Sequence, residues 1–82
     1  MKVLVTGGMG YIGSHTCIAL HEAGVTPVIY DNLSNASARV LDQLEKITGT
    51  RFEFILGDIQ DEQQFKLALK HTKAEAVFHF AA

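Results

Sequence analysis

Four closely spaced glycines are the residues of this 82-residue chain whose type and spacing most clearly point to chemistry. An apolar run over residues 3–5 comes first, and a helical pattern follows the glycines Gly7, Gly8, Gly10 and Gly13. Glycine lets the backbone approach a phosphate without a Cβ in the way, and the unpaired N–H groups at a helix N-terminus attract an anion. The pattern therefore predicts a turn that binds the pyrophosphate of a dinucleotide.

Two registers of these glycines fit such a turn. Gly8-x-Gly10-x-x-Gly13 has the usual form of the dinucleotide fingerprint, and Gly7-x-x-Gly10-x-x-Gly13 is an equally good spacing. The sequence leaves both registers open. Glycine-rich turns without a ligand are common, so the context of the motif carries much of the argument.

An acidic residue, Asp31, supplies that context at the end of the next predicted strand, 18 positions after Gly13. A carboxylate there accepts hydrogen bonds from the hydroxyls of an adenosine ribose. The same negative charge repels a 2′-phosphate, and the next positions, Asn32 and Leu33, offer no cation. We therefore expect NAD rather than NADP as the cofactor.

Composition excludes several other classes of function. The net charge is −2 with no basic cluster, so we expect no nucleic-acid partner. A single cysteine, Cys17, excludes an internal disulfide and a multi-cysteine zinc site, and favours a reducing, cytoplasmic compartment. The four histidines lack ligand spacing, so we expect no metal, and His79 is predicted to lie in a buried strand and hydrogen-bond locally. The first strand is too short for a membrane span, so we expect no membrane partner.

Apolar runs alternate with helical patterns along the chain and predict an α/β fold. The strands are expected over residues 2–6, 26–30, 52–56 and 76–80, with helices over about 11–23, from the polar stretch 32–37 to Gly49, and from Asp61 onward. Gly24 is a predicted helix end, and Asp61 with Gln64 resembles a capping box. The expected inward faces of the helices are Ile12, Thr16, Ala19, Leu20 and Ala23; Val40, Leu41, Leu44 and Ile47; and Phe65, Ala68 and Leu69.

This alternation predicts the first half of a Rossmann-like, doubly wound parallel sheet, with three helices and four strands in the order 3-2-1-4. We expect residues 1–82 to be a truncated NAD-binding domain, the N-terminal piece of a larger protein, with no second domain in this chain. Strand 76–80 would then present an unpaired apolar edge through which the fragment could self-associate.

Four segments together resemble the extended short-chain dehydrogenase/reductase family. They cover the length of the chain and read TGGMGYIGSH at 6–15, YDNLSN at 30–35, GDI at 57–59 and FHFAA at 78–82. The resemblance is strongest to members that invert C4 of a UDP-hexose. It implies an NAD-holding enzyme that oxidises C4, lets the keto sugar rotate and returns the hydride to the other face.

The resemblance also implies which residues do the work. The catalytic Tyr, Lys and Ser or Thr of the family lie beyond the equivalent of Ala82, so no catalytic residue is expected here and the chain alone should be inactive. Tyr11 and Tyr30 have no Lys four residues on, and a packing or loop role is favoured for both. The UDP-hexose substrate and a homodimer are expected only of the full-length protein. Alternatives are a nucleotide-sugar dehydratase and a non-catalytic nucleotide-binding module.

Cofactor contacts are expected from four groups of residues. The pyrophosphate turn comprises Gly7, Gly10, Tyr11, Ile12 and Gly13, with the amides of Tyr11 and Ile12 as donors. By the resemblance, the other groups are the adenosine pocket Asp31, Asn32, Leu33, Ser34, Asn35 and Ala36, the adenine contacts Asp58 and Ile59, and the crevice residues Phe80, Ala81 and Ala82. A turn or cap role is the alternative for Asp58.

Overall fold

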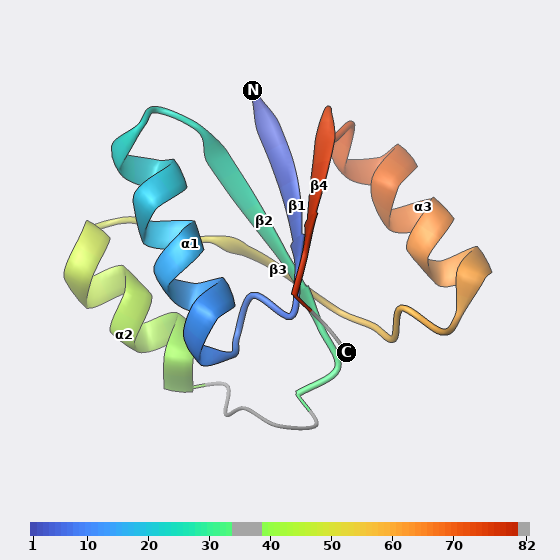
Figure 1. Cartoon of the computed structure of the whole chain (residues 1–82), viewed down its shortest axis with the longest axis horizontal. Helices are drawn as coiled ribbons and strands as arrows, with labels where there is room; N and C mark the ends of the chain where they lie inside the picture. The colour runs from blue at the N-terminus through green and yellow to red at the C-terminus, as the bar shows by residue number, and fades with distance from the viewer. Residues whose placement is uncertain (34–38, 81–82) are drawn as a thin grey trace.

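The computed structural model describes residues 1–33 and 39–80. Within these residues a parallel sheet of four strands alternates with three helices (Figure 1). The elements are β1 (Lys2–Thr6), α1 (Tyr11–Glu22), β2 (Thr26–Asp31), α2 (Arg39–Thr48), β3 (Glu53–Leu56), α3 (Glu62–Thr72) and β4 (Ala76–His79). The strand order is β3-β2-β1-β4, so the predicted fold class and topology are confirmed.

Strand β1 is an interior strand of the sheet and pairs with both β2 and β4. Val5 lies opposite Ile29 on one side and Phe78 on the other. Helices α1 and α2 cover one face of the sheet and α3 covers the other (Figure 1). A strand covered on both faces needs apolar side chains at successive positions, which explains the uninterrupted apolar run of β1.

Two buried clusters hold these layers together. The larger lies under α1 and α2 and consists of Val3, Val5, Met9, Cys17, Ile29, Leu41, Leu44 and Phe52. The smaller lies under α3 and consists of Leu4, Val28, Tyr30 and Ala68. Successive residues of β1 thus supply both clusters, as the alternation of side chains along a strand requires.

Pro27 lies within β2 without breaking the sheet. The N–H of Thr26 donates to Met1 O at 2.9 Å on the β1 side, so the nitrogen of Pro27 faces the β3 side. Pairing with β3 begins only at Val28, opposite Glu53. The missing donor of proline therefore costs no hydrogen bond of the ladder.

Three predicted strand bounds differ by one residue from the structure. β2 extends to Asp31, β3 begins at Glu53, and β4 ends at His79. Phe52 precedes β3 and is itself buried in the larger cluster, which explains why an apolar residue stands there outside the strand. Phe80 follows β4 and its N–H still donates to Thr6 O at 2.9 Å. Each difference is a matter of where regular pairing ends.

The predicted inward face of α1 is wrong in most of its members. Ile12 is 65% exposed, Ala19 and Ala23 are exposed, and Thr16 and Leu20 are half-buried. The buried residues of this helix are instead Gly13 and Cys17. Apolar residues occur around most of α1, so the pattern alone does not identify the packed side. The contact of Gly13 with the preceding turn fixes which side meets the sheet.

The other two helices agree better with their predicted faces. Leu41 and Leu44 of α2 are buried. Ile47, also predicted to face inward, is 65% exposed and lines the groove between α1 and α2. On α3, Ala68 is buried, and Phe65 and Leu69 pack against the smaller cluster as predicted.

Helix ends follow the predicted signals in part. Gly24 has a φ of +83° and its N–H donates to His21 O at 3.0 Å, as expected of a helix-terminating glycine. Asp61 caps α3, because its Oδ1 accepts from the N–H of Gln64 at 3.1 Å. The second half of the capping box is not formed at this described helix start: the side-chain Oε1 of Gln64 accepts from the N–H of Asp58 at 3.4 Å, and the N–H of Asp61 donates to Asp58 O at 3.0 Å.

Tyr30 is the largest fully buried side chain of the described residues. Its hydroxyl donates to Asp58 O at 3.1 Å, and its ring meets Phe65 edge-on with a centroid distance of 5.5 Å. Burial, and then the negative charges of Asp61 and Asp58, raise the pKa of Tyr30. A Cβ on Gly57 would lie 2.5 Å from the Tyr30 ring, so only glycine fits over it. The predicted packing role of Tyr30 is confirmed.

Tyr30→Phe should lower the free energy of unfolding by about 1 kcal/mol, because it removes one buried hydrogen bond and keeps the ring. The matched control is Tyr11→Phe, which changes an 81% exposed side chain and should stay within about 0.5 kcal/mol of wild type. Urea unfolding of the three proteins makes the comparison. Equal losses in both variants would contradict the buried role of the Tyr30 hydroxyl.

Candidate functional site

The predicted site residues that the structure describes gather at one end of the sheet. All strands are parallel, so the segments that follow β1, β2, β3 and β4 leave the sheet at the same edge (Figure 1). Strand β1 lies between β2 and β4, so the strand order reverses at the neighbouring strands β1 and β4. Sheets of this topology bind ligands at the place where the strand order reverses.

The glycine turn begins at Gly7, a position whose backbone conformation favours glycine. Gly7 has a φ of +71°, its N–H donates to Tyr30 O at 2.9 Å, and its carbonyl accepts from the N–H of Gly10 at 3.1 Å. Gly10 then has the extended backbone of an N-cap, with φ −77° and ψ 176°. The chain thereby reverses from β1 into α1 within four residues.

The remaining glycines of the turn differ in what requires them. A Cβ on Gly13 would lie 2.2 Å from Gly7 O, so the helix can approach the turn only with glycine there. A Cβ on Gly8 would lie 2.9 Å from the Ile29 side chain. A Cβ on Gly10 would make only an ordinary contact of 3.4 Å with Gly7 O, so the chain's own packing does not demand glycine at this position.

Helix α1 starts with unpaired donors. The first intrahelical N–H is that of Ser14, which donates to Gly10 O at 2.8 Å. The N-cap has no side chain, and no acidic residue lies in the first turn of this described helix. The N–H groups of Tyr11, Ile12 and Gly13 therefore present the positive end of the helix dipole to whatever lies beyond it.

Asp31 reaches across from the end of β2 to the glycine turn. Its Oδ2 accepts from the N–H of Met9 at 2.9 Å, and its Oδ1 accepts from the N–H of Leu33 at 2.8 Å. Leu33 has a φ of +61°, a left-handed conformation that costs a non-glycine residue about 1–2 kcal/mol. Hydrogen bonds to a charged group contribute roughly 1.5–3 kcal/mol, enough to offset that cost.

Sequence reasoning missed Met9, whose backbone amide joins the two loops. The side chain type gives no signal for this role, because the donor is the main chain. The signal that was available is the pair of positions, a glycine turn followed by an acidic strand end. That pair predicts proximity to a ligand but not a direct bond between the two segments.

Asp58 and Ile59 lie in the segment after β3. Asp58 Oδ1 accepts from the N–H of Gln60 at 2.9 Å, which is the geometry of a local turn. Ile59 is half-buried and packs against the smaller cluster under α3. The N–H of Gly57 donates to Asp31 O at 3.1 Å and so places this segment beside the end of β2.

Of the other predicted contacts, Asn32 is exposed at the end of β2, and Phe80 is 40% exposed beside the end of β1. Three backbone hydrogen bonds bring together the segments that follow the four strands. In these bonds the N–H of Gly7 donates to Tyr30 O, that of Gly57 to Asp31 O, and that of Phe80 to Thr6 O. Five predicted residues lie outside the described part of the chain: Ser34, Asn35, Ala36, Ala81 and Ala82.

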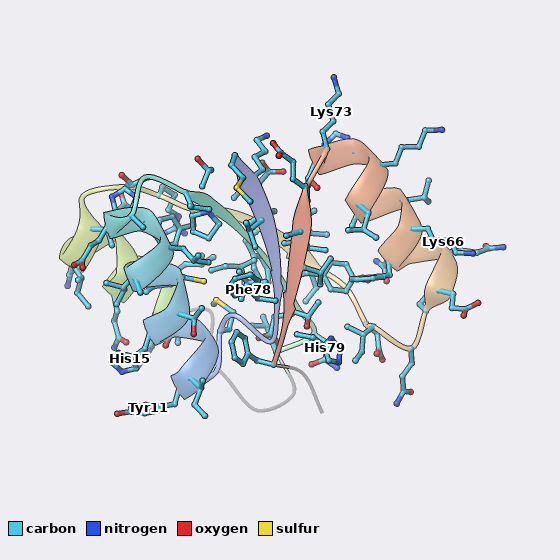
Figure 2. All side chains as sticks on the ribbon, turned by 45° about the horizontal axis from the view of Figure 1, so that its top comes forward. Tyr11, His15, Lys66, Lys73, Phe78 and His79 are labelled. Atoms are coloured by element: carbon cyan, nitrogen blue, oxygen red, sulfur yellow. The ribbon has the colours of Figure 1, made fainter. Side chains whose placement is uncertain are left out.

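Two histidines lie near these segments (Figure 2). The Nδ1 of His79 is 2.8 Å from the hydroxyl of Thr6, which confirms the predicted local hydrogen bond. The predicted burial of His79 is wrong, because the residue is exposed on an edge strand. His15 meets Tyr11 edge-on at the start of α1, with ring centroids 4.5 Å apart.

Other kinds of site find little support among residues 1–33 and 39–80. Cys17 is a free, buried thiol, and burial raises its pKa to about 12, so it is neutral and unreactive at neutral pH. No group of three His, Cys, Asp or Glu side chains in these ranges could hold a metal ion. Each helix in these ranges is too short or too polar to cross a bilayer.

The sequence family described as GDP-mannose 4,6 dehydratase matches residues 4–82, nearly the whole chain. The chain belongs to this family. Among curated relatives, a UDP-glucose 4-epimerase from Klebsiella pneumoniae is 51% identical over 81 residues, which are 99% of this chain and 58% of the relative. The chain therefore spans little more than half of that protein's length.

Solved structures of UDP-glucose 4-epimerases share the same arrangement. The enzyme from Stenotrophomonas maltophila, with bound NAD and formylated UDP-arabinopyranose, has a TM-score of 0.96 and 45% identity over all of this chain and 24% of its own. The enzyme from Bifidobacterium longum, in complex with NAD+ and UDP, has a TM-score of 0.94 and 36% identity over the same shares. The resemblance to nucleotide-sugar epimerases stated from the sequence is confirmed.

Gly13→Ala should lower the free energy of unfolding by about 1–3 kcal/mol, because its Cβ would overlap the Gly7 carbonyl and no side chain can move to relieve the overlap. Gly10→Ala is the matched control in the same turn and should change stability by less than about 1 kcal/mol. Thermal or urea unfolding of both variants tests this. Indistinguishable losses would mean that the close approach of helix and turn is not needed for folding.

Proposed function

We propose that this chain forms the NAD-binding part of a UDP-glucose 4-epimerase-like enzyme, which interconverts UDP-galactose and UDP-glucose by transient oxidation at C4. The observation that carries the proposal is the likeness to the NAD-bound Stenotrophomonas enzyme, at 45% identity and a TM-score of 0.96 over all of this chain. The geometry supports it independently, since a glycine turn leads into an uncapped helix start beside a carboxylate.

The glycine turn fits a pyrophosphate. Gly10 is not required by the chain's own packing, so glycine there keeps space open in front of the helix start. We assign the amides of Tyr11 and Ile12 as pyrophosphate donors, with Gly7, Gly10 and Gly13 shaping the turn. When bound, NAD would supply the hydride acceptor, while this chain's residues bind and orient it.

The adenosine end of the cofactor is assigned to the segments after β2 and β3. Asp31 has two further acceptor positions on its carboxylate after binding the amides of Met9 and Leu33, and we assign these to the ribose hydroxyls. Asn32, Leu33, Ser34, Asn35 and Ala36 complete the pocket by resemblance to the family. Asp58 and Ile59 are proposed at the adenine, and Phe80, Ala81 and Ala82 at the crevice beside β4.

Catalytic proton transfer is proposed to lie with residues outside this chain. Tyr30 is buried against Phe65, and its raised pKa opposes ionisation. Tyr11 makes an edge-on ring contact with His15, and no lysine follows it four residues later. The UDP-hexose substrate and a homodimeric assembly belong to the proposed function of the whole enzyme. We also propose a cytoplasmic setting for it, in keeping with the single, free cysteine of the chain.

A nucleotide-sugar dehydratase is the second candidate, because the matching family takes its description from a dehydratase. An assay of the gene product with UDP-galactose separates the two. An epimerase returns UDP-glucose with no loss of water, whereas a dehydratase forms a 4-keto-6-deoxy sugar with its usual substrate and leaves UDP-galactose unchanged.

In the gene product, NAD should bind at least about tenfold more tightly than NADP, because a 2′-phosphate would replace a hydrogen-bonded hydroxyl with a negative charge facing Asp31. Asp31→Ala should lower the ratio of the NAD affinity to the NADP affinity, mainly by weakening the binding of NAD. Calorimetric titration of both nucleotides measures it.

The matched control is Asp42→Ala, which removes the same charge at an exposed position paired with Arg51. It should leave the ratio between the two affinities unchanged. Equal affinities of the wild-type protein for NAD and NADP would contradict the role assigned to Asp31.

We further propose that the isolated 82-residue chain self-associates through β4. This strand is an edge of the described sheet. Val77 and Phe78 within it, and Phe80 directly after it, are each about 40% exposed. An edge strand offers unpaired N–H and C=O groups to a second chain, and apolar side chains around it favour contact.

Val77→Lys should keep the isolated chain monomeric at concentrations where wild type associates, because a charged side chain on an edge strand opposes pairing. Leu67→Lys is the control, since Leu67 is 66% exposed on α3 and is not part of the edge strand. Sedimentation velocity over a wide concentration range compares the three. A monomeric wild-type chain throughout that range would refute association through this edge.

A further inference from the structure

Asp31 holds two segments that are separate in the sequence. Its Oδ2 accepts from the Met9 amide at 2.9 Å, across 22 positions of the chain, and its Oδ1 accepts from the Leu33 amide at 2.8 Å. Both bonds are charge-assisted and both donors are main-chain groups. The carboxylate therefore fixes the backbone of the glycine turn and the backbone that leaves β2 at the same time.

Met9 is placed where this bond matters for the turn. It directly precedes the N-cap Gly10, and its side chain is buried in the larger cluster, so core packing and Asp31 hold the residue from two sides. The orientation of the following amides, at Tyr11 and Ile12, depends on where Met9 and Gly10 lie. A change at Asp31 is thereby transmitted to the helix start without any ligand.

Leu33 is the second residue whose backbone is held by a hydrogen bond to Asp31. Its φ of +61° is unusual for a non-glycine residue, and the bond from its N–H to Asp31 supports it in that conformation. The direction in which the chain leaves β2 therefore also depends on the carboxylate.

We propose that Asp31 is a positioning residue for the pyrophosphate turn, in addition to its assigned contact with the ribose. Its carboxylate holds the turn and the segment after β2 in their binding conformation before the nucleotide arrives. This inference rests on the proposed NAD function and deepens it, because it couples recognition of the ribose to recognition of the pyrophosphate through one side chain.

The effect of removing Asp31 on a nucleotide that lacks the ribose hydroxyls distinguishes a positioning role from direct contact with the ribose. If Asp31 acted only on the ribose hydroxyls, its removal would leave a nucleotide without those hydroxyls unaffected, or would strengthen its binding by removing a negative charge near the pyrophosphate. If Asp31 positions the turn, its removal weakens that nucleotide as well.

The test is an affinity matrix on the gene product, with NAD and an NAD analogue whose adenosine ribose lacks both the 2′- and 3′-hydroxyls. Asp31→Ala should weaken NAD by about 10- to 100-fold and the dideoxy analogue still by about 3- to 10-fold. Asp31→Asn keeps one acceptor oxygen and should lie between wild type and Asp31→Ala for both ligands. Asp42→Ala should change neither affinity. Unchanged or tighter binding of the analogue by Asp31→Ala overturns the positioning role.

A second readout needs no ligand. In the amide spectrum of the protein, Asp31→Ala should displace the signals of the Met9 and Leu33 N–H groups, which donate to the carboxylate in the wild type, and also those of Tyr11 and Ile12. Undisturbed signals from the helix start in Asp31→Ala would overturn the inference. Failure of wild type to bind NAD overturns the proposed function instead, and the amide spectra then still decide whether Asp31 orders the turn.

Discussion

The contact between Gly13 and the carbonyl of Gly7 determines how the rest of the chain is arranged. A methyl group at position 13 would lie 2.2 Å from that oxygen, so the first turn of α1 rests directly on the glycine turn. This contact sets the rotation of the helix about its own axis, which puts Cys17 into the larger cluster and leaves Ile12 outward. The same contact brings the unpaired amides of the helix start to the end of β1, where β2 and β4 also end.

The sheet was the part of the fold most open to prediction from sequence. Its strands are short apolar runs separated by helices, and alternation of this kind permits few topologies once crossovers are right-handed. The ends of α1 and α3 were also predictable, because Gly24 and Asp61 act through local backbone chemistry. These features depend on neighbours in sequence or on a rule that applies to all parallel sheets.

What could not be predicted depends on contacts between distant residues. The packed side of α1 follows from the glycine contact and not from its apolar pattern, and Ile47 is exposed because α2 packs through Leu41 and Leu44. The hydrogen bond from Met9 to Asp31 uses a main-chain donor, so the residue type at position 9 does not predict it. At the candidate site, the glycines and the acidic strand end were visible in the sequence, but the way in which they hold one another was not.

The two tyrosines give the chain a pair of built-in optical probes. It contains no tryptophan and only Tyr11 and Tyr30, so its near-ultraviolet signal comes chiefly from two phenol rings in opposite surroundings. Tyr30 lies in the interior against Phe65, and its signal reports whether that interior is packed. Tyr11 is in solvent at the first residue of α1, and its signal reports on the surroundings of the helix start. Folding and events at the helix start can thus be followed separately in the unlabelled protein, because the two rings differ in polarity of environment.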